Sequence, residues 1–238
     1  MNDSPHELVV RDLGRMTYAP ALALQREINL AVSLDETPDT LLLVEHDPVI
    51  TVSHRKGVEN HILASPLQRK RLGVELAETD RGGDVTYHGP GQLVAYPILR
   101  LDRYGLNLAR YMRLLEQVII DAVAGFDVTA IRDSGATGVW VDRGSPPAGE
   151  PALAKLAALG VRVRKHTTLH GLALNVTTDL THFQLIDPCG LGHRPVTSLH
   201  ALLGSRCPDM DTVKTELAEQ LRRSLAAGST ATPKPPAA

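Results

Sequence analysis

The chain has 238 residues, of which 43% are hydrophobic, so it can bury the core of one large domain. Lys and Arg number 25 against 27 Asp and Glu, and this net charge of −2 argues against general nucleic-acid binding. Only 3% of the residues are aromatic, so the core must be built mainly from Leu, Val, Ala and Ile.

The cysteines and the N-terminus indicate the cellular compartment in which the protein works. Cys189 and Cys207 show neither metal-ligand spacing nor a framework of bridges, which fits a reducing cytoplasm. The N-terminus lacks a basic segment followed by an apolar one, so no signal peptide is expected. No apolar run approaches the roughly 20 residues that span a bilayer. We therefore expect a soluble cytoplasmic protein.

Apolar runs and alternating patterns predict strands, and apolar residues at four-residue steps predict helices. Strands are expected at 7–10, 41–44, 49–52, 85–87, 93–99, 127–131, 138–141, 161–165 and 169–176. Helices are expected at 18–32, 66–72, from the N-cap Asn107 to Ala124, and 210–225. This mixture predicts an α/β or α+β domain with a mixed sheet at 1–226. The Ala/Pro/Ser/Thr-rich tail at 227–238 is expected to be disordered.

A thiol and an amine stand out as a possible pair. Pro188 and Gly190 flank Cys189, and such a turn can present a thiol to a substrate, although a free cysteine is most often a buried hydrophobe. Lys155 enters a run of small apolar residues, although an exposed charge is the ordinary role of a lysine. Its ammonium would favour the thiolate, and its free amine could act as a base. Such a pair can carry an acyl group as a thioester without ATP.

The densest glycine cluster is the segment RGGDVTYHGPGQ at 81–92. Its four glycines and one proline in twelve residues favour a ligand contact over a plain hairpin, because glycines let a backbone approach a ligand closely. The loop at 143–151, with three prolines and two glycines, lies just before Lys155.

The histidines leave several interpretations open. His166 and His170 are four residues apart, but their surroundings alternate as in a strand, so we reject a zinc site there. His193 lies four residues after Cys189 and could form a Cys–His pair. His46 ends a buried strand, where it could line a site or serve the fold.

Taken together, several segments resemble the lipoate–protein transferase B family, the octanoyltransferases of lipoate biosynthesis. They are EHDPVIT at 45–51, RGGDVTYHGPGQ at 81–92, LVAYP at 93–97, TGVW at 137–140, KLAALG at 155–160, LHGLALN at 169–175, DPCG at 187–190 and VTSL at 196–199. Each is weak alone, but their order and spacing make the set specific. The loop at 143–151 is longer than the family pattern suggests.

The resemblance implies a biotin/lipoate-ligase-like fold, with a mixed central sheet and a small C-terminal subdomain. It also implies that Cys189 is the acyl-thioester nucleophile and that Lys155 tunes the thiol and serves as acid and base. The residues implied to bind the acyl substrate are Arg81, Gly82, Gly83, Asp84, Val85, Thr86, Tyr87, His88, Ala158, Leu159, Gly160, Gly171, Leu172 and Ala173.

The resemblance further implies an acyl transfer that uses neither ATP nor a metal. The donor would be octanoyl-acyl carrier protein. The acceptors would be the lipoyl domains of 2-oxoacid dehydrogenase complexes and the H protein of the glycine cleavage system. Neither nucleic acid nor a membrane is an expected partner.

Three other functions compete with this one. An ATP-dependent lipoate or biotin ligase on the same fold would not need Cys189. A cysteine hydrolase would pair Cys189 with His193 and release free octanoate. A module that only binds a lipoyl domain or an acyl carrier would transfer nothing.

Overall fold

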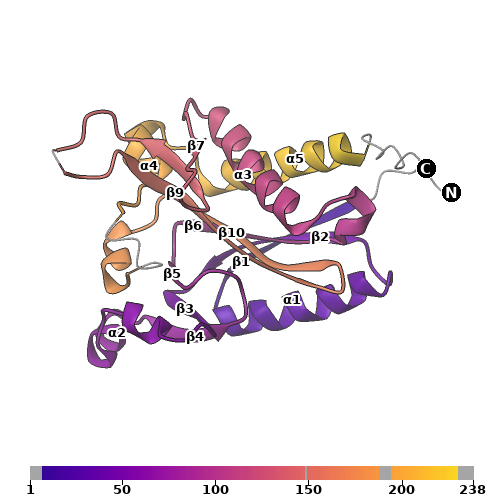
Figure 1. Cartoon of the computed structure of the whole chain (residues 1–238), viewed down its shortest axis with the longest axis horizontal. Coiled ribbons are helices and arrows are strands. Elements are labelled where there is room, and N and C mark those ends of the chain that lie inside the picture. Colours follow the sequence, from indigo (N-terminus) through magenta and orange to yellow (C-terminus); the bar gives the residue numbers. More distant parts are fainter. Residues whose placement is uncertain (1–6, 148, 188–193, 230–238) are drawn as a thin grey trace.

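A mixed seven-stranded sheet forms the centre of the molecule (Figure 1). It is seen in a computed structural model that describes residues 7–147, 149–187 and 194–229. In spatial order the strands are β1 (Leu8–Met16), β2 (Asp39–His46), β6 (Gln92–Ile98), β10 (Thr167–Asn175), β9 (Leu153–Arg164), β8 (Val139–Asp142) and β7 (Ile131–Arg132). β1 and β2 run parallel, and every other pair of neighbours in this sheet is antiparallel.

A second, three-stranded sheet lies below the central one in Figure 1. Its strands are, in spatial order, β4 (Glu75–Thr79), β3 (Val49–Ser53) and β5 (Val85–His88). β3 pairs parallel with β4 and antiparallel with β5. Leu185 and Ile186 pack into the apolar core of this small sheet. The chain is therefore anchored there just before residue 187.

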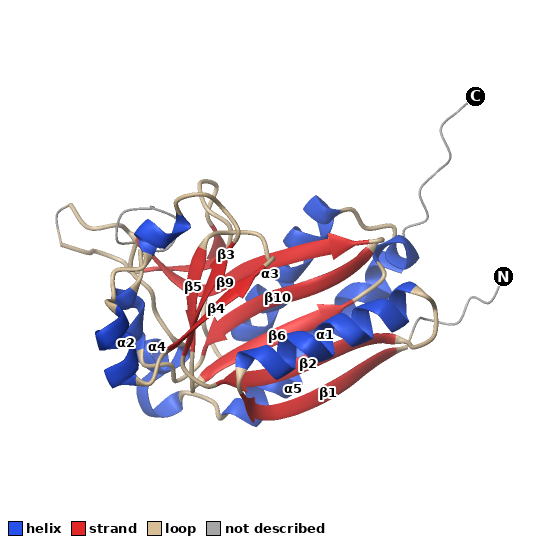
Figure 2. Cartoon of the chain, turned by 90° about the horizontal axis from the view of Figure 1, so that it is seen from below, coloured by secondary structure: helices blue, strands red, loops and turns tan. Residues whose placement is uncertain are grey.

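Helices cover both faces of the central sheet. α1 (Tyr18–Ser33) lies on one face, where Figure 2 shows it running lengthwise over the strands, and α3 (Leu108–Ala124) and α5 (Met210–Ser229) cover the other. The shorter helices are α2 (Pro66–Leu72) and α4 (Leu199–Leu203), with 3₁₀ turns at Val58–His61, Leu101–Tyr104, Leu180–Leu185 and Gly204–Arg206. α5 shares the core of α3, so the C-terminal part of the chain packs on the central sheet.

The two-sided cover explains the continuous apolar run in β2. Leu41 and Leu43 pack into the core beneath α3 and α5, whereas Leu42 and Val44 pack against α1. Successive side chains of a strand point to opposite faces, so a strand buried on both faces needs apolar residues at every position. The same rule predicted this strand from the sequence.

Most predicted elements are found, with longer ends. Asn107 caps α3 as expected, and its side chain accepts a hydrogen bond from the Arg110 amide at 2.9 Å. The strand predicted at 161–165 is only the end of β9, which already begins at Leu153. The strand predicted at 127–131 is wrong, because Asp127 has a φ of 62° and only Ile131–Arg132 pairs with β8.

Two further differences concern the surface. β4 escaped the sequence analysis because most of it is exposed and its pattern does not alternate. The predicted boundary at 226 falls inside α5, which continues to Ser229. Among the described residues, no helix is both long and apolar enough to cross a membrane.

Replacing Gly171 by alanine should destabilise the fold. A Cβ at this position would lie 2.2 Å from the Ala95 carbonyl oxygen and 2.7 Å from Pro97 Cδ. We expect Gly171→Ala to lower the free energy of unfolding by about 1–3 kcal/mol, as overpacking of a core typically does. Denaturant unfolding measures it, with Gly135→Ala as the control, since a Cβ there meets nothing nearer than 3.7 Å. Equal stability of the two variants would contradict this account.

Candidate active site

A cavity of about 410 Å³ opens between the central sheet, the segment 81–88 and the beginning of α3. Every residue that the sequence suggested for the acyl site, except Tyr87, lines this cavity, and so does Lys155. Tyr87 points the other way, into the core of the small sheet, where its ring stacks on His182. Tyr87 lies between Thr86 and His88 in β5, and neighbouring residues of a strand face opposite sides, so its side chain points away from the cavity that these two line.

Small residues on two neighbouring strands form part of the cavity wall. Gly160 of β9 pairs with Gly171 of β10, and Ala158 pairs with Ala173. Alternate positions on paired strands share a face, so the four residues form one shallow surface. Such a surface leaves room for a ligand or for another segment of the chain.

The segment 81–84 uses some of that room itself. The Gly82 amide donates a hydrogen bond to the Val161 carbonyl at 3.0 Å, and a Cβ at Gly160 would lie 2.8 Å from the Gly82 carbonyl oxygen. Gly82 and Gly160 therefore allow two parts of the chain to meet. The close approach that their sequence suggested is, at these two positions, an approach of backbone to backbone.

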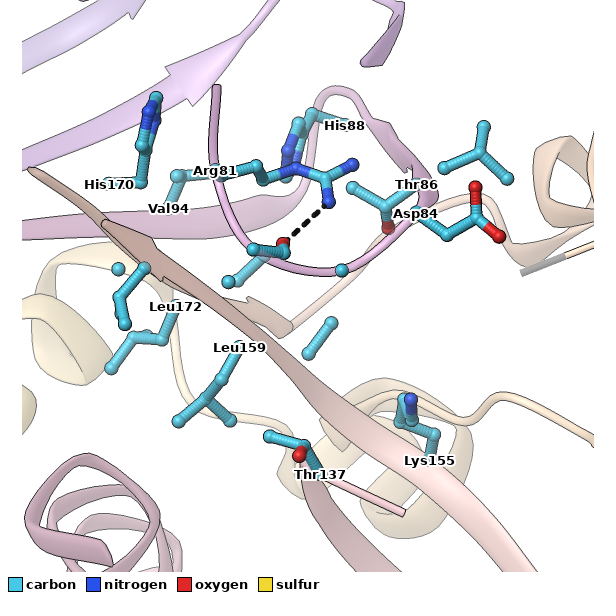
Figure 3. Close-up of a pocket in the computed structure, with 18 of the residues that line it drawn as sticks. Arg81, Asp84, Thr86, His88, Val94, Thr137, Lys155, Leu159, His170 and Leu172 are labelled. Atoms are coloured by element: carbon cyan, nitrogen blue, oxygen red, sulfur yellow. Dashed lines mark hydrogen bonds between the residues drawn. The ribbon is translucent and has the colours of Figure 1, made fainter. Parts of the chain in front are cut away.

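Arg81 ties the same segment to β3. Its guanidinium donates to the Thr51 carbonyl at 2.9 Å and to the Thr51 hydroxyl at 3.0 Å. It also donates to the Gly82 carbonyl at 3.1 Å, the bond drawn as a dashed line in Figure 3. These bonds hold the loop across the small residues of β9 and β10. Arg81 thus shapes the wall that it lines.

Lys155 lies at the end of the cavity opposite His170 (Figure 3). Its Nζ is 4.6 Å from the centre of the Trp140 ring, and the Arg194 guanidinium lies 3.8 Å from the centre of the same ring. Arg194 also forms an ion pair with Asp133. A ring that attracts two cations fixes both side chains at one place.

The main chain of Lys155 is held by the segment that follows residues 188–193. The Lys155 amide donates to the Pro195 carbonyl at 2.8 Å, and the Thr197 amide donates to the Lys155 carbonyl at 2.9 Å. On the other side, the Asp187 amide donates to the His61 carbonyl at 2.8 Å. Cys189 and His193, with Pro188, Gly190 and Gly192, lie outside the described residues.

The structure adds residues that the sequence analysis did not assign. Gly138 has a φ of 135°, and a Cβ there would lie 2.8 Å from the Ala157 carbonyl oxygen and 3.2 Å from Lys155 Cε. The absence of a side chain at Gly138 therefore makes room for the Lys155 side chain. In the sequence, only the TGVW motif at 137–140 drew attention to this glycine. Leu108 and Met112 of α3 supply apolar wall that no local motif announces.

Buried imidazoles gather near the cavity. His46 does not line it: its Nδ1 donates to the Met16 carbonyl at 3.0 Å, and its Nε2 accepts from the Tyr96 hydroxyl at 2.7 Å. His46 therefore serves the fold. His170 pairs with Asp80 at 2.8 Å, and among the described residues no group of three His, Cys, Asp or Glu side chains could hold a metal ion.

Burial keeps these rings neutral. It lowers the pKa of His88 to about 3, helped by the nearby His46 and opposed by the hydrogen bond to Gln92. Burial also lowers the pKa of His46 and that of His170. The cavity is thus bordered by uncharged imidazoles at neutral pH, and an apolar ligand meets no histidine cation there.

The comparisons with known proteins agree on one family. Residues 17–222 match the family described as lipoyl protein ligase A/B catalytic domain. A protein named octanoyltransferase from Geobacter metallireducens is 44% identical over 201 residues, which are 84% of this chain and 86% of the relative. Another from Pelobacter propionicus is 46% identical over 212 residues, which are 89% and 92% of the two chains.

Solved structures share the fold. A putative lipoate protein ligase from T. acidophilum with bound lipoic acid superposes with a TM-score of 0.68 at 17% identity, covering 94% of this chain and 87% of that one. Lipoate-protein ligase A bound with ATP gives 0.68 at 17% identity, covering 94% and 86%. Biotin protein ligase from Aquifex aeolicus gives 0.54 at 11% identity, covering 94% and 71%. The predicted biotin/lipoate-ligase-like fold is confirmed.

Acid should destabilise the protein through its buried histidines. The pKa of His88 is about 3 in the folded protein but about 6.5 when unfolded, so between these values only the unfolded state binds the proton. The contribution of neutral His88 to the free energy of unfolding is fully present above pH 6.5. It falls by up to about 1.4 kcal/mol per pH unit as the pH drops toward 3.

The pH dependence of denaturant unfolding measures this effect. We expect His88→Asn to flatten the slope between pH 6 and 4, since the amide cannot titrate. His200→Asn is the control, because the His200 side chain is exposed. An unchanged slope in His88→Asn would show that His88 is not the group that takes up the proton.

Proposed function

Because this chain belongs to the lipoyl protein ligase A/B catalytic domain family, we propose that it is an octanoyltransferase. It takes the octanoyl group from octanoyl-acyl carrier protein and passes it to a lysine of a lipoyl domain, through a thioester on Cys189. Lipoyl domains of 2-oxoacid dehydrogenase complexes and the glycine cleavage H protein are the acceptors. The reaction uses neither ATP nor a metal.

One observation carries the proposal: Lys155 lies at one end of an apolar cavity, hydrogen-bonded to the segment that follows Cys189 in sequence. A cavity of about 410 Å³ falls in the range of about 300–1,000 Å³ typical of small-molecule sites. Its wall includes Leu108, Met112, Leu159 and Leu172. These side chains suit an alkyl chain, whose burial contributes about 0.8 kcal/mol per methylene.

The first half of the reaction exchanges one thioester for another. The Cys189 thiolate attacks the carbonyl carbon of the donor, a new C–S bond forms, and the bond to the carrier's sulfur breaks. Lys155, as an ammonium, favours the thiolate and gives its proton to the departing thiolate. The acyl group stays activated, so no nucleotide has to be spent.

The second half forms an amide. The amine of the acceptor lysine attacks the acyl-Cys189 carbonyl, the C–N bond forms, and the C–S bond breaks. Lys155, now a free amine, takes the proton that the attacking nitrogen loses. Each turnover thus returns Cys189 to a thiolate and Lys155 to an ammonium.

Two groups near Lys155, the Trp140 ring and the Arg194 guanidinium, act in opposite directions on its ammonium form. The Trp140 ring attracts the ammonium form, and the fixed cation of Arg194 on the same ring repels it. A lysine that must both hold and release a proton benefits from such a balance. Asp133, paired with Arg194, keeps the guanidinium in place.

The first test is the mass of the intact protein after incubation with octanoyl-acyl carrier protein and no ATP. We expect one added octanoyl group, removable by hydroxylamine and discharged by an apo-lipoyl domain. Cys189→Ser should lack the adduct, and Cys207→Ser, the matched control at the only other cysteine, should keep it.

Other outcomes would support the competing functions. Amide formation only with ATP would point to a ligase. Release of free octanoate, lost in His193→Ala, would point to a hydrolase. Binding of the lipoyl domain without any acyl adduct would leave a binding module. Each of these results contradicts the proposed transferase.

Lys155→Met tests the acid and base role. We expect discharge of the acyl-enzyme to slow by about 10²–10⁴-fold, the usual contribution of a positioned acid or base. Lys165→Met is the control, since Lys165 is exposed near the far end of β9. Single-turnover rates measure both variants. A discharge rate in Lys155→Met equal to that of the control would remove Lys155 from the mechanism.

A further inference from the structure

A chain of hydrogen bonds runs through the interior from the cavity wall to Lys155. His88 Nδ1 and Gln92 Oε1 are 2.7 Å apart, and Gln92 Nε2 lies 2.9 Å from Asn175 Oδ1. Asn175 Nδ2 lies 2.9 Å from the Thr197 carbonyl oxygen, and the Thr197 amide lies 2.9 Å from the Lys155 carbonyl oxygen. The His88, Gln92 and Asn175 side chains are all buried.

The Thr197 carbonyl at one end of this chain determines which atom donates in each side-chain bond. A carbonyl oxygen can only accept, so Asn175 must present its NH₂ group to Thr197 and its oxygen to Gln92. Gln92 then presents its NH₂ group to Asn175 and to the Tyr87 carbonyl, which leaves its oxygen for His88. His88 therefore carries its proton on Nδ1. The three side-chain donors all point from His88 toward the Thr197 carbonyl, an arrangement in which each bond strengthens the next.

Asn175 lies at the point where the hydrogen-bonded neighbour of β9 changes from β10 to the segment 195–197. β10 ends at Asn175, and its pairing with β9 reaches only Ala157. At Lys155 the neighbour of β9 on that side is the segment 195–197, which runs parallel to it. The Asn175 side chain joins the end of β10 to Thr197, the last residue of the segment 195–197.

We propose that Asn175 is a positioning residue for Lys155, acting through the Thr197 carbonyl and oriented by Gln92. This inference rests on the proposed function, in which Lys155 is the acid and base. The ammonium of a lysine is carried on a flexible stem, so its reach depends on where the backbone is fixed. Loss of the Asn175 bond would free the segment 195–197, and with it both backbone bonds of Lys155.

The test compares two buried asparagines, Asn175 of β10 and Asn29 of α1, whose side-chain amides each donate to a main-chain carbonyl. Asn175→Leu is close in size and removes the bond to Thr197. Asn29→Leu is the matched control, because Asn29 Nδ2 donates to the Thr168 carbonyl at 3.0 Å, near the opposite end of β10. Each variant leaves a main-chain carbonyl without its side-chain donor, and Asn175→Leu also removes the acceptor of Gln92 Nε2, so both should unfold at a lower temperature, Asn175→Leu at least as much as Asn29→Leu.

Two measurements separate positioning from mere stability. The first is single-turnover discharge of acyl-enzyme to an apo-lipoyl domain, which we expect to slow about 10–100-fold in Asn175→Leu alone, the cost of misplacing a catalytic group by about 1 Å. The KM for the acceptor should not change. The second is the pH dependence with which a water-soluble amine reagent labels Lys155, read by peptide mass, which should move only in Asn175→Leu.

The outcomes are distinct. If Asn175→Leu matches Asn29→Leu in both measurements, the positioning role is wrong. If no acyl-enzyme forms even in the unaltered protein, the proposed function fails, and the labelling profile still decides whether Asn175 places Lys155. Should Asn175→Leu not fold, Gln92→Met removes the donor that orients Asn175 and should slow discharge in the same direction. An unaltered rate in Gln92→Met would then overturn the proposal.

Discussion

β9 exchanges one hydrogen-bonding neighbour for another next to Lys155, and the rest of the site depends on that exchange. β10 pairs with β9 as far as Ala157, and residues 195–197 take over at Lys155. The exchange brings residues 195–197, which follow Cys189 in sequence, alongside the lysine. Backbone hydrogen bonds form this arrangement, and the Asn175 side chain ties the new neighbour to the end of β10.

The sheet around Lys155 places a charged side chain next to an apolar cavity, although the two require different surroundings. A lysine is strongly hydrated, whereas an alkyl chain needs a dry wall. Small residues on β9 and β10 let the segment 81–84 lie directly against the sheet, and Trp140 provides a face that attracts a cation without a counter-charge. The charged group and the apolar cavity can therefore share a border.

The sequence predicted the parts of the fold that depend on local pattern. The two-sided burial of β2, the cap at Asn107 and the apolar stripe of α5 can all be read from spacing. Ile131–Arg132 could not, because the conformation of Asp127 interrupts the strand that the composition favours. β4 could not either, since its strand form comes from pairing with β3 rather than from its own exposed residues.

For the site, the motifs predicted which residues gather but not what each one does. The glycines at 82 and 160 are signals of close approach, yet only the fold reveals that they approach each other. Tyr87 stands inside a motif and faces away from the cavity. Asn175 and Gly138 stand in motifs and Met112 in none, but all three act through contacts between distant segments, and the sequence pattern does not reveal those contacts.

The loop between β8 and β9 is closed at its base. The Arg143 amide donates to the Ala152 carbonyl at 2.8 Å, and Arg143 pairs with Glu150. β8 and β9 are already paired from Asp142 and Leu153 inward, with Trp140 opposite Lys155. Extra residues inserted beyond this closure would lengthen the tip and leave the register at Lys155 alone. The hairpin end can therefore drift in length during evolution, and it offers a permissive position for a label or a tether.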